Sequence, residues 1–356
     1  MLARRFRRTG DIDGFHIAIK HSEQALATTP QDHPGRPTVF NNLVVEFFQK
    51  FQELGDLEDL QKAITHGDQA RAATPQDHPR QASSCLHMGQ CLELRSKILN
   101  CSEDINESLP LYQEACDCHT SPPRDRISAS RRAASILFST GQFHESSTLL
   151  ERAVGLMPSV NLRLLNRDDQ QHILSDLEGL SSSAASMALC AGREAYHSLQ
   201  LLELGQGIIM GFTIDSRSEF SELEMDHPLE LRQFNRLRAE IDSPIDGING
   251  ASFEPPDQAQ NRVGSRHWDA VKQMDVILDR IRTFPGYCGF LLPPPPEDLM
   301  KLAEIGPLVV VNCTPYRSDA IIVTTSGITS LELRKLKYEE TTRWMTQFGG
   351  FGAGGS

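Results

Sequence analysis

Apolar residues in the first half of the chain recur every three to four positions, which is the spacing of one face of an α-helix. Residues 42–51 carry this stripe at Leu43, Phe47, Phe48 and Phe51. Gly55 follows it, and glycine closes helices because it adopts the left-handed conformation at low cost. A second stripe begins after Asp56, a residue suited to cap a helix, and ends at Thr74-Pro75, because proline cannot continue the hydrogen-bond ladder. The pattern predicts two antiparallel helices.

This pattern repeats with a period of 45 residues. The segment from Gly10 to Pro34 matches the segment from Gly55 to Pro79, and both contain Gly-Asp, Ala-Ile and Thr-Pro-Gln-Asp-His-Pro. A third unit continues the stripe at Ile105, Leu109, Tyr112 and Ala115. A period of this length is typical of a solenoid, in which each unit buries its apolar face by stacking on its neighbours. We expect a helical solenoid over residues 1–158, with an incomplete first unit and a frayed N-terminus.

A fourth, shorter unit carries the most specific resemblance in this half. Its small residues and closing proline are Ala134, Gly141, Ala153 and Pro158. These positions resemble those of the tetratricopeptide repeat, and the 45-residue units resemble the longer variants common in fungal proteins. The resemblance implies a scaffold that binds proteins or peptides on its concave face.

Strand character occurs only near the end of the chain. Helical patterns are expected at 169–193, 194–212, 229–241 and 266–282, followed by strands at 308–313, 319–324 and 328–333 and a helix from Tyr338 to Phe348. Ser326-Gly327 is expected to form the hairpin turn between the last two strands. Three strands make a thin sheet with a poorly covered face, so we expect the region 308–333 to be marginally stable and prone to aggregate through its open edge.

Two stretches in this half resemble the CHAT domain, a caspase-like module found with tetratricopeptide arrays. They run from Leu201 to Glu219 and from Leu291 to Val323, and the most specific pieces are Gly-Pro-Leu-Val-Val-Val-Asn and Tyr-Arg-Ser-Asp-Ala. The expected organisation is therefore a repeat region (1–158), a helical extension (159–242), a flexible loop (243–262), a CHAT fragment (263–348) and a glycine-rich tail (349–356). The fold class is mainly α, with the opening strands of an incomplete α/β domain.

Active members of that family are cysteine peptidases with a His and a Cys on later strands. Here no His follows His267 and no Cys follows Cys313, so no catalytic residue is transferred and the chain is not expected to be an enzyme. One alternative is a peptidase whose catalytic strands are missing from a truncated gene model or come from another polypeptide. Another is a decayed enzyme that regulates a full-length relative.

Other reactive groups favour structural interpretations. Cys313 with His267 matches no nucleophile turn, Cys116-Asp117-Cys118-His119 lacks a paired zinc knuckle, and His87 with Cys91 is only a weak metal signal. The Asp-His-Pro triplets at Asp32, Asp77 and Asp226 indicate turns, in which Asp accepts backbone hydrogen bonds. Gly205-Gln206-Gly207 lacks a preceding strand and indicates close helix packing rather than a phosphate site. No cofactor or metal is expected.

Composition limits the classes of partner that the chain is expected to bind. The formal net charge of −12 disfavours nucleic acid, apart from a small basic run at residues 4–8. We expect no membrane span and no secretory signal, and eight scattered cysteines are typical of reduced thiols, so a cytoplasmic location is expected. No pattern defines an oligomeric state. The expected partner is a protein or peptide, and the candidate groove residues are Asn41, Asn42, Gln49, Gln90 and Arg95.

Overall fold

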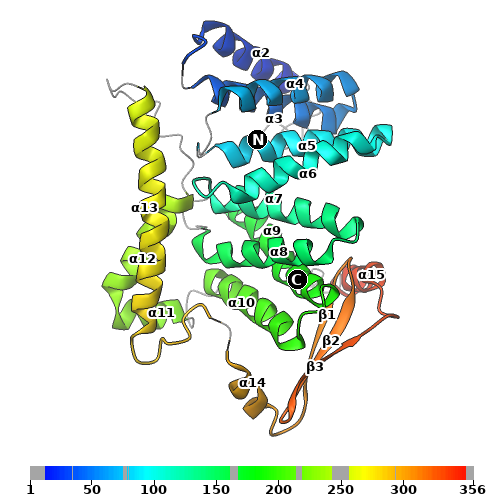
Figure 1. Cartoon of the computed structure of the whole chain (residues 1–356), viewed down its shortest axis with the longest axis vertical. Helices are drawn as coiled ribbons and strands as arrows, with labels where there is room; N and C mark the ends of the chain where they lie inside the picture. Colours follow the sequence, from blue (N-terminus) through cyan, green and yellow to red (C-terminus); the bar gives the residue numbers. More distant parts are fainter. Residues whose placement is uncertain are drawn as a thin grey trace, which may run out of the picture. The chain divides into compact units, whose positions relative to one another are not determined.

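The computed structural model of the chain describes residues 13–33, 35–74, 78, 80–160, 167–213, 219–242, 256–292 and 294–349. This part is mainly helical, with one three-stranded sheet near its C-terminal end (Figure 1). Contacts divide the chain into two compact units, residues 1–136 with 240–272 and residues 137–239 with 273–356. Each unit is described by itself.

The first unit consists of successive helices that pack in antiparallel pairs (Figure 1). They are α2 (Asp13–Thr28), α3 (Arg36–Leu54), α4 (Leu57–Ala73), α5 (Gln81–Leu99), α6 (Ser102–Asp117) and most of α7 (Pro123–Ser139). Helices α3 and α4 form one hairpin and α5 and α6 the next, and α4 packs against α5 to join them. The helical pairs predicted from the 45-residue pattern are confirmed.

The first helix of each hairpin ends at a left-handed residue. Gly55 closes α3 with φ 78° and Asn100 closes α5 with φ 52°. These two positions are equivalent in the repeat, and Gly141 after α7 has φ 78° as well. Glycine and asparagine adopt this conformation most easily, which ends the helix and reverses the chain into the next one.

Close helix contacts set the spacing within the first unit. Tyr112 of α6 is fully buried and lies against Gly89 of α5, where an added Cβ would stand 2.6 Å from the tyrosine ring. Gly67 of α4 lies in the same way against the Met88 side chain, at 3.3 Å. A small residue on one helix therefore receives a large side chain from its neighbour at both contacts.

The second unit continues with paired helices. They are α8 (Phe143–Leu156) with the short 3₁₀ helix η1 (Met157–Ser159), α9 (Arg167–Cys190), α10 (Ala195–Thr213), α11 (Glu219–Asp226), α12 (Pro228–Asp242) and the latter part of α13 (Pro256–Arg282). Helix α9 packs between α8 and α10, and it ends near Gly192, which again has a positive φ of 76°. A buried aromatic group of Phe220, Phe234 and Phe290 joins α11 and α12 to the segment after α13.

The sheet belongs to the second unit and has the order β1-β2-β3, all antiparallel. Its strands are β1 (Leu308–Cys313), β2 (Ser318–Thr324) and β3 (Gly327–Glu332). Helix α14 (Pro296–Leu302) contacts β2 and β3, α10 contacts β3, and α15 (Tyr338–Gly349) lies on the other side of the sheet (Figure 1). The central strand is mostly buried, whereas β3 and most of β1 are exposed or half-buried.

Two expectations change in this region. Residues 256–262 were predicted to belong to a flexible loop, but they form the first turns of α13. Pro256 stands at the helix start, where a backbone N–H would have no partner within the helix, so a proline fits there. The β2–β3 turn is formed by Thr325 and Ser326, since Gly327 already pairs with Thr324. Residues 1–12 of the incomplete first unit, residues 243–255 of the expected loop and the glycine-rich end after residue 349 lie outside the described residues.

Candidate functional site

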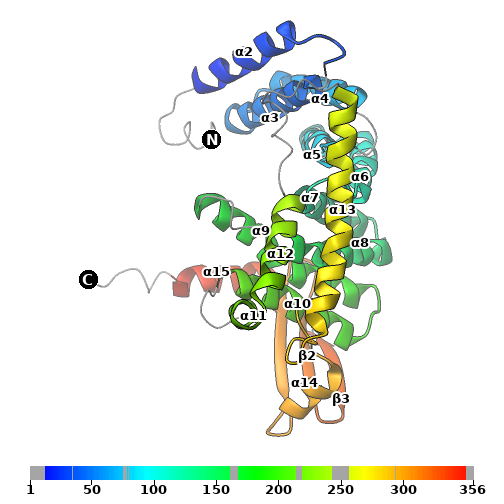
Figure 2. The same cartoon turned by 90° about the vertical axis from the view of Figure 1, so that its left-hand side faces the viewer.

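The first helices of the two complete hairpins in the first unit share one polar face. On α3, Asn42 and Gln49 are two turns apart on one side of the helix, and Asn42 is exposed. On α5, Gln90 shares a stripe with Ser83 and His87, and all three are half-buried. Helices α3 and α5 contact each other, and Figure 2 shows them on one side of the stack, with α4 and α6 on the other. We call Asn42, Gln49, Ser83, His87 and Gln90 the polar face.

Asn41 does not belong to the polar face. Its Nδ2 donates a hydrogen bond of 2.6 Å to Ser84 Oγ across the contact between α3 and α5, and the residue is buried. Its Oδ1 is buried without a hydrogen-bond partner in the described structure. One position along a helix turns a side chain by about 100°, so Asn41 faces the neighbouring helix while Asn42 faces outward. Asn41 was expected to line the groove, but in the structure its side chain joins two hairpins.

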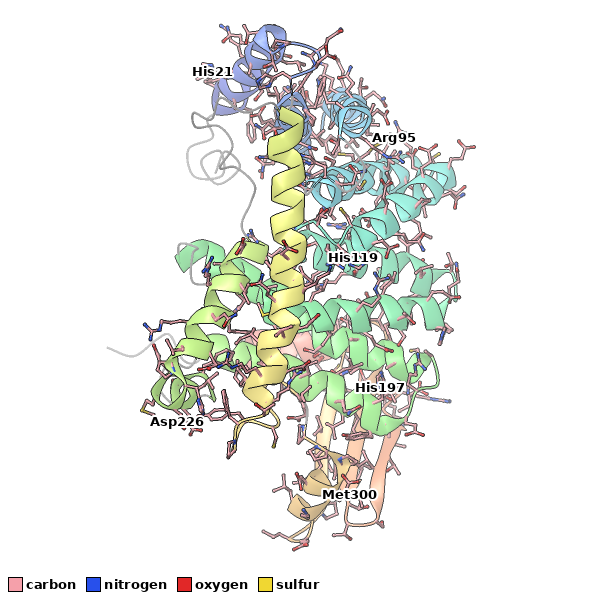
Figure 3. All side chains as sticks on the ribbon, turned by 60° about the vertical axis from the view of Figure 1, so that its left-hand side comes forward. His21, Arg95, His119, His197, Asp226 and Met300 are labelled. Carbon is pink, nitrogen blue, oxygen red and sulfur yellow. The ribbon has the colours of Figure 1, made fainter. Side chains whose placement is uncertain are left out.

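Arg95 also lies away from the polar face. Its Nε and Nη2 each donate a hydrogen bond of 2.7 Å to the Asp104 carboxylate of α6, and its Nη1 donates to Gln61 Oε1 of α4 at 2.8 Å. Figure 3 labels Arg95 on α5. The hydrogen bonds from Arg95 lower the pKa of Asp104. The guanidinium of Arg95 therefore joins the second helices of two hairpins, and its expected contact with a partner stays a prediction.

A second ionic cluster joins three helices. The Glu93 carboxylate accepts hydrogen bonds from Tyr112 Oη at 2.8 Å, Arg132 Nη1 at 2.9 Å and Lys97 Nζ at 2.5 Å. Burial alone would raise the pKa of Glu93, but the hydrogen bonds from Lys97 and Tyr112 and the charge of Arg132 outweigh it and lower the pKa. Glu93 therefore ties α5 to α6 and α7 and is occupied by internal contacts.

Of the polar-face residues, Ser83 was not among the expected groove residues, and His87 was expected only as part of a weak metal signal. Burial lowers its pKa to about 4, so the ring is neutral at pH 7. Its Nδ1 is buried, and the described residues offer it no hydrogen-bond partner. The signal was available, because Ser83, His87 and Gln90 stand four and three positions apart on one helical stripe.

The side chains of the cysteine motif at residues 116–119 form local contacts with neighbouring side chains. Ser130 Oγ donates to Cys116 Sγ at 3.1 Å, Ser121 Oγ donates to Cys118 Sγ at 3.1 Å, and His119 Nδ1 lies 3.1 Å from Arg126 Nη2. Across the part of the chain that the structure describes, no group of three or more His, Cys, Asp and Glu residues is placed to hold a metal ion. Burial raises the pKa of Cys91, the partner suggested for His87, to about 12.

Cys313 lies among hydroxyl groups. Ser318 Oγ donates to its Sγ at 3.1 Å, and Thr341 Oγ1 lies 3.4 Å away. The side chain of His267, its suggested partner, lies outside the described residues, although its backbone belongs to α13. These contacts hold the β1–β2 turn against the start of α15.

The histidines of the Asp-His-Pro triplets organise the turns between hairpins. His33 Nδ1 accepts a hydrogen bond of 3.0 Å from Gly35 N, and His78 Nδ1 accepts one of 3.1 Å from Arg80 N. The turn interpretation assigned this hydrogen bonding to aspartate. Asp226 instead accepts from Tyr287 Oη at 2.9 Å, and Asp77 lies outside the described residues. Gly205 fits the packing interpretation, since a Cβ there would overlap the Ser181 side chain of α9.

The second unit contains a cleft of about 480 Å³ between the β1–β2 turn and the start of α15. Tyr316, Arg317, Arg334 and Lys337 line it together with Glu332 and Glu339. The Arg317 guanidinium is already paired with the buried Asp319 carboxylate through Nε at 2.7 Å. With Arg317 neutralised by Asp319, the remaining Arg334 and Lys337 are balanced by Glu332 and Glu339, so the cleft has no net charge to select a ligand.

No family model matches the chain, and no curated protein matches it. Among solved structures, the chain is similar to a putative kinesin light chain of Podospora anserina with nearly identical TPR-like repeats. The identity is 16%, the match covers 71% of this chain and 99% of that chain, and the TM-score is 0.33. A superposition this loose assigns neither a partner nor an activity to this chain. None of the helices in the described ranges combines the length and apolar character needed to cross a membrane.

Proposed function

We propose that the chain is a protein-interaction scaffold of the tetratricopeptide type, and that a protein or peptide partner binds to the polar face of α3 and α5. The observation that carries the proposal is that the polar residues of the first unit fall into two groups, one in internal contacts and one on an accessible face. The amide nitrogen of Asn41 and the buried carboxylate of Asp104 are occupied by internal contacts, whereas Asn42, Gln49 and Gln90 lie on one accessible face without a hydrogen bond among the described contacts.

Amide side chains suit this role because each offers both a donor and an acceptor. They can bind the backbone of an extended peptide without the desolvation cost of a charged group. The repeated stacking of hairpins aligns such side chains into an extended surface. An uncharged polar segment is therefore the expected ligand for this face.

The test is affinity capture with the full chain, comparing two matched triple variants. Asn42→Ala, Gln49→Ala and Gln90→Ala remove the amides of the polar face. Asn106→Ala, Gln113→Ala and Gln69→Ala remove the same groups from exposed positions on α6 and α4. A partner retained by the wild type and the control, and bound at least tenfold more weakly by the polar-face variant, supports the proposal. Equal retention by all three proteins, or no enriched partner, contradicts it.

A CHAT-like origin of the strand region belongs to the same proposal and rests on the two sequence motifs. We assign no catalytic role to Cys313, because its recorded neighbours are hydroxyl groups. Peptide cleavage by the purified chain that disappears on Cys313→Ala would favour the peptidase alternative. A cytoplasmic location is also part of the proposal, since all eight cysteines are free thiols, and imaging of a fluorescent fusion tests it.

A further inference from the structure

Strand β1 is an outer strand of the sheet, and its free edge carries a defined set of backbone groups. In an antiparallel pair, residues alternate between those whose backbone groups face the neighbouring strand and those whose groups face away. Thr314 N donates a hydrogen bond of 3.2 Å to Arg317 O. This pair follows directly on Cys313 and Ser318 and so continues the register in which β1 pairs with β2. Every second residue before Thr314 therefore also bonds to β2, and these residues are Asn312, Val310 and Leu308. The N–H and C=O groups of Val309, Val311 and Cys313 therefore face outward.

These outward groups have no recorded backbone partner among the residues that the structure describes. Their side chains lie on the sheet face opposite to Asn312, and Val309 and Val311 are 57% and 56% exposed. Most proteins protect such an edge with a charge, a proline or a bulge. The six residues of β1 contain no charged residue and no proline, so the edge is open to another strand.

The other outer strand is different. Both outer strands contact helices, β3 with α10 and α14 and β1 with α9 on the Asn312 face of the sheet, but only β3 carries a charge, because Glu332 lies at its end and is paired with Arg334 at 3.4 Å. A charge on an edge strand opposes pairing with a second copy of itself, because like charges would meet. The accessible pairing edge of this sheet is therefore β1.

We propose that β1 pairs in antiparallel fashion with β1 of a second copy of this chain, with the two-fold axis at Val311. Outward groups must meet outward groups, so odd-numbered residues of β1 pair with odd-numbered residues of the second copy. The axis at Val311 pairs Val311 with its own equivalent and Val309 with Cys313, which satisfies the outward groups of all three residues. The alternative axis at Val310 leaves Cys313 without a partner.

Side chains match in the same arrangement. Val311 is opposite Ala320, and Ala320 is opposite Leu331, which is 56% exposed. In the dimer, the row formed by Val311, Ala320 and Leu331 would continue across the two-fold axis into the equivalent row of the second copy. No charged residue lies in β1, so the edge is complementary to itself, as a two-fold interface requires.

The expected dimer is weak. One short strand with its apolar row contributes less surface than the 1,200–2,000 Å² or so of a stable interface. The net charge of −12 on each copy also opposes association. Added salt screens this repulsion, so dimerisation should strengthen as ionic strength rises, opposite to an interface held by ion pairs.

The test is sedimentation equilibrium of the full chain from about 1 to 100 μM, with two lysine variants matched for exposure. Val311→Lys places a charge at the proposed axis, and Val276→Lys places one at a 67% exposed site on α13. The proposal expects a monomer–dimer equilibrium in the wild type and Val276→Lys, and at least tenfold weaker association in Val311→Lys. Thermal melting establishes that both variants fold.

Amide exchange of the wild type provides a test that needs no variant. Protection of Val309, Val311 and Cys313 should rise with protein concentration. A wild type that stays monomeric, a dimer unaffected by Val311→Lys, or equal weakening by both lysines would overturn the proposal. A different polypeptide found on β1 in the purified protein would also overturn it.

Discussion

Lys50 and Arg95 occupy the same position of two successive hairpins, 45 residues apart, and each pairs with the aspartate nine positions further on. Lys50 Nζ lies 2.9 Å from Asp59 Oδ1, and Arg95 binds Asp104 with two hydrogen bonds. Both carboxylates are buried. The ion pair between the helices of a hairpin is thus a repeated element of the array.

Loss of the second ion pair should destabilise the protein. Arg95→Ala leaves the buried Asp104 carboxylate without its guanidinium partner, and removal of one member of a buried pair costs about 3–5 kcal/mol. Because the Arg95 side chain is 24% exposed, we expect a smaller loss, about 2–3 kcal/mol, in urea unfolding. Lys301→Ala, which breaks an exposed pair with Asp298 on α14, is the control and should leave the urea midpoint unchanged. Equal effects would contradict the structural role of Arg95.

A methyl group at Gly89 should be destabilising. The added Cβ would stand 2.6 Å from Cε1 of the fully buried Tyr112, and overpacking of this kind typically costs 1–3 kcal/mol or so. Gly155→Ala on α8 meets no atom within 4 Å and should instead stabilise the helix by up to about 1 kcal/mol. Thermal unfolding of the two variants measures the difference. A neutral Gly89→Ala would show that α5 and α6 are further apart than described.

Stability should fall as the pH is lowered from about 6.5 to 4. The unfolded His87 side chain takes up a proton near pH 6.5, whereas burial lowers its pKa in the folded protein to about 4. Between these values the unfolded state binds more protons, so each such group reduces stability by at most about 1.4 kcal/mol per pH unit. His78, whose pKa is lowered to about 4 mainly by burial, acts in the same direction.

Urea unfolding at a series of pH values separates the two histidines. His87→Gln should flatten the dependence between pH 6.5 and 4 by one proton, and the double variant with His78→Gln should flatten it further. An unchanged slope in His87→Gln would mean that its ring is accessible to solvent in the folded protein.

The eight thiols should react in a fixed order. Cys288 is exposed, whereas Cys85 and Cys91 are buried with pKa values raised to about 12, chiefly by burial. Because the thiolate is the reactive form, maleimide should modify Cys288 first and Cys85 and Cys91 last. Peptide mass spectrometry of partially labelled protein gives the order, and labelling in denaturant provides the control. Early modification of Cys91 would contradict the packing of α5.

Much of the helical architecture was predictable, because it depends on local signals. The stripe from Leu43 to Phe51, the glycine at position 55 and the proline after Thr74 each act within a few residues. The strands were predicted to within one residue at each end, since β-branched residues and turn residues also act locally. Helix α13 begins earlier than expected, because a proline that ends one helix can equally start another.

The roles of individual polar residues were less predictable. Asn41 and Asn42 have the same chemistry, and only the packing of α3 against α5 separates them. Arg95 could have been assigned from the repeat, since Lys50 and Asp59 recur as Arg95 and Asp104 at the same spacing.

The hydrogen bonds of His33 and His78 show that the joints between hairpins are interchangeable. Each imidazole accepts from the backbone two residues ahead, Gly35 in one joint and Arg80 in the other. A deletion of residues 34–78 would place Arg80 two positions after His33 and restore the same joint. Removal or addition of one 45-residue segment therefore changes the array by a whole hairpin while keeping the joint, so the length of the binding surface can change in complete units.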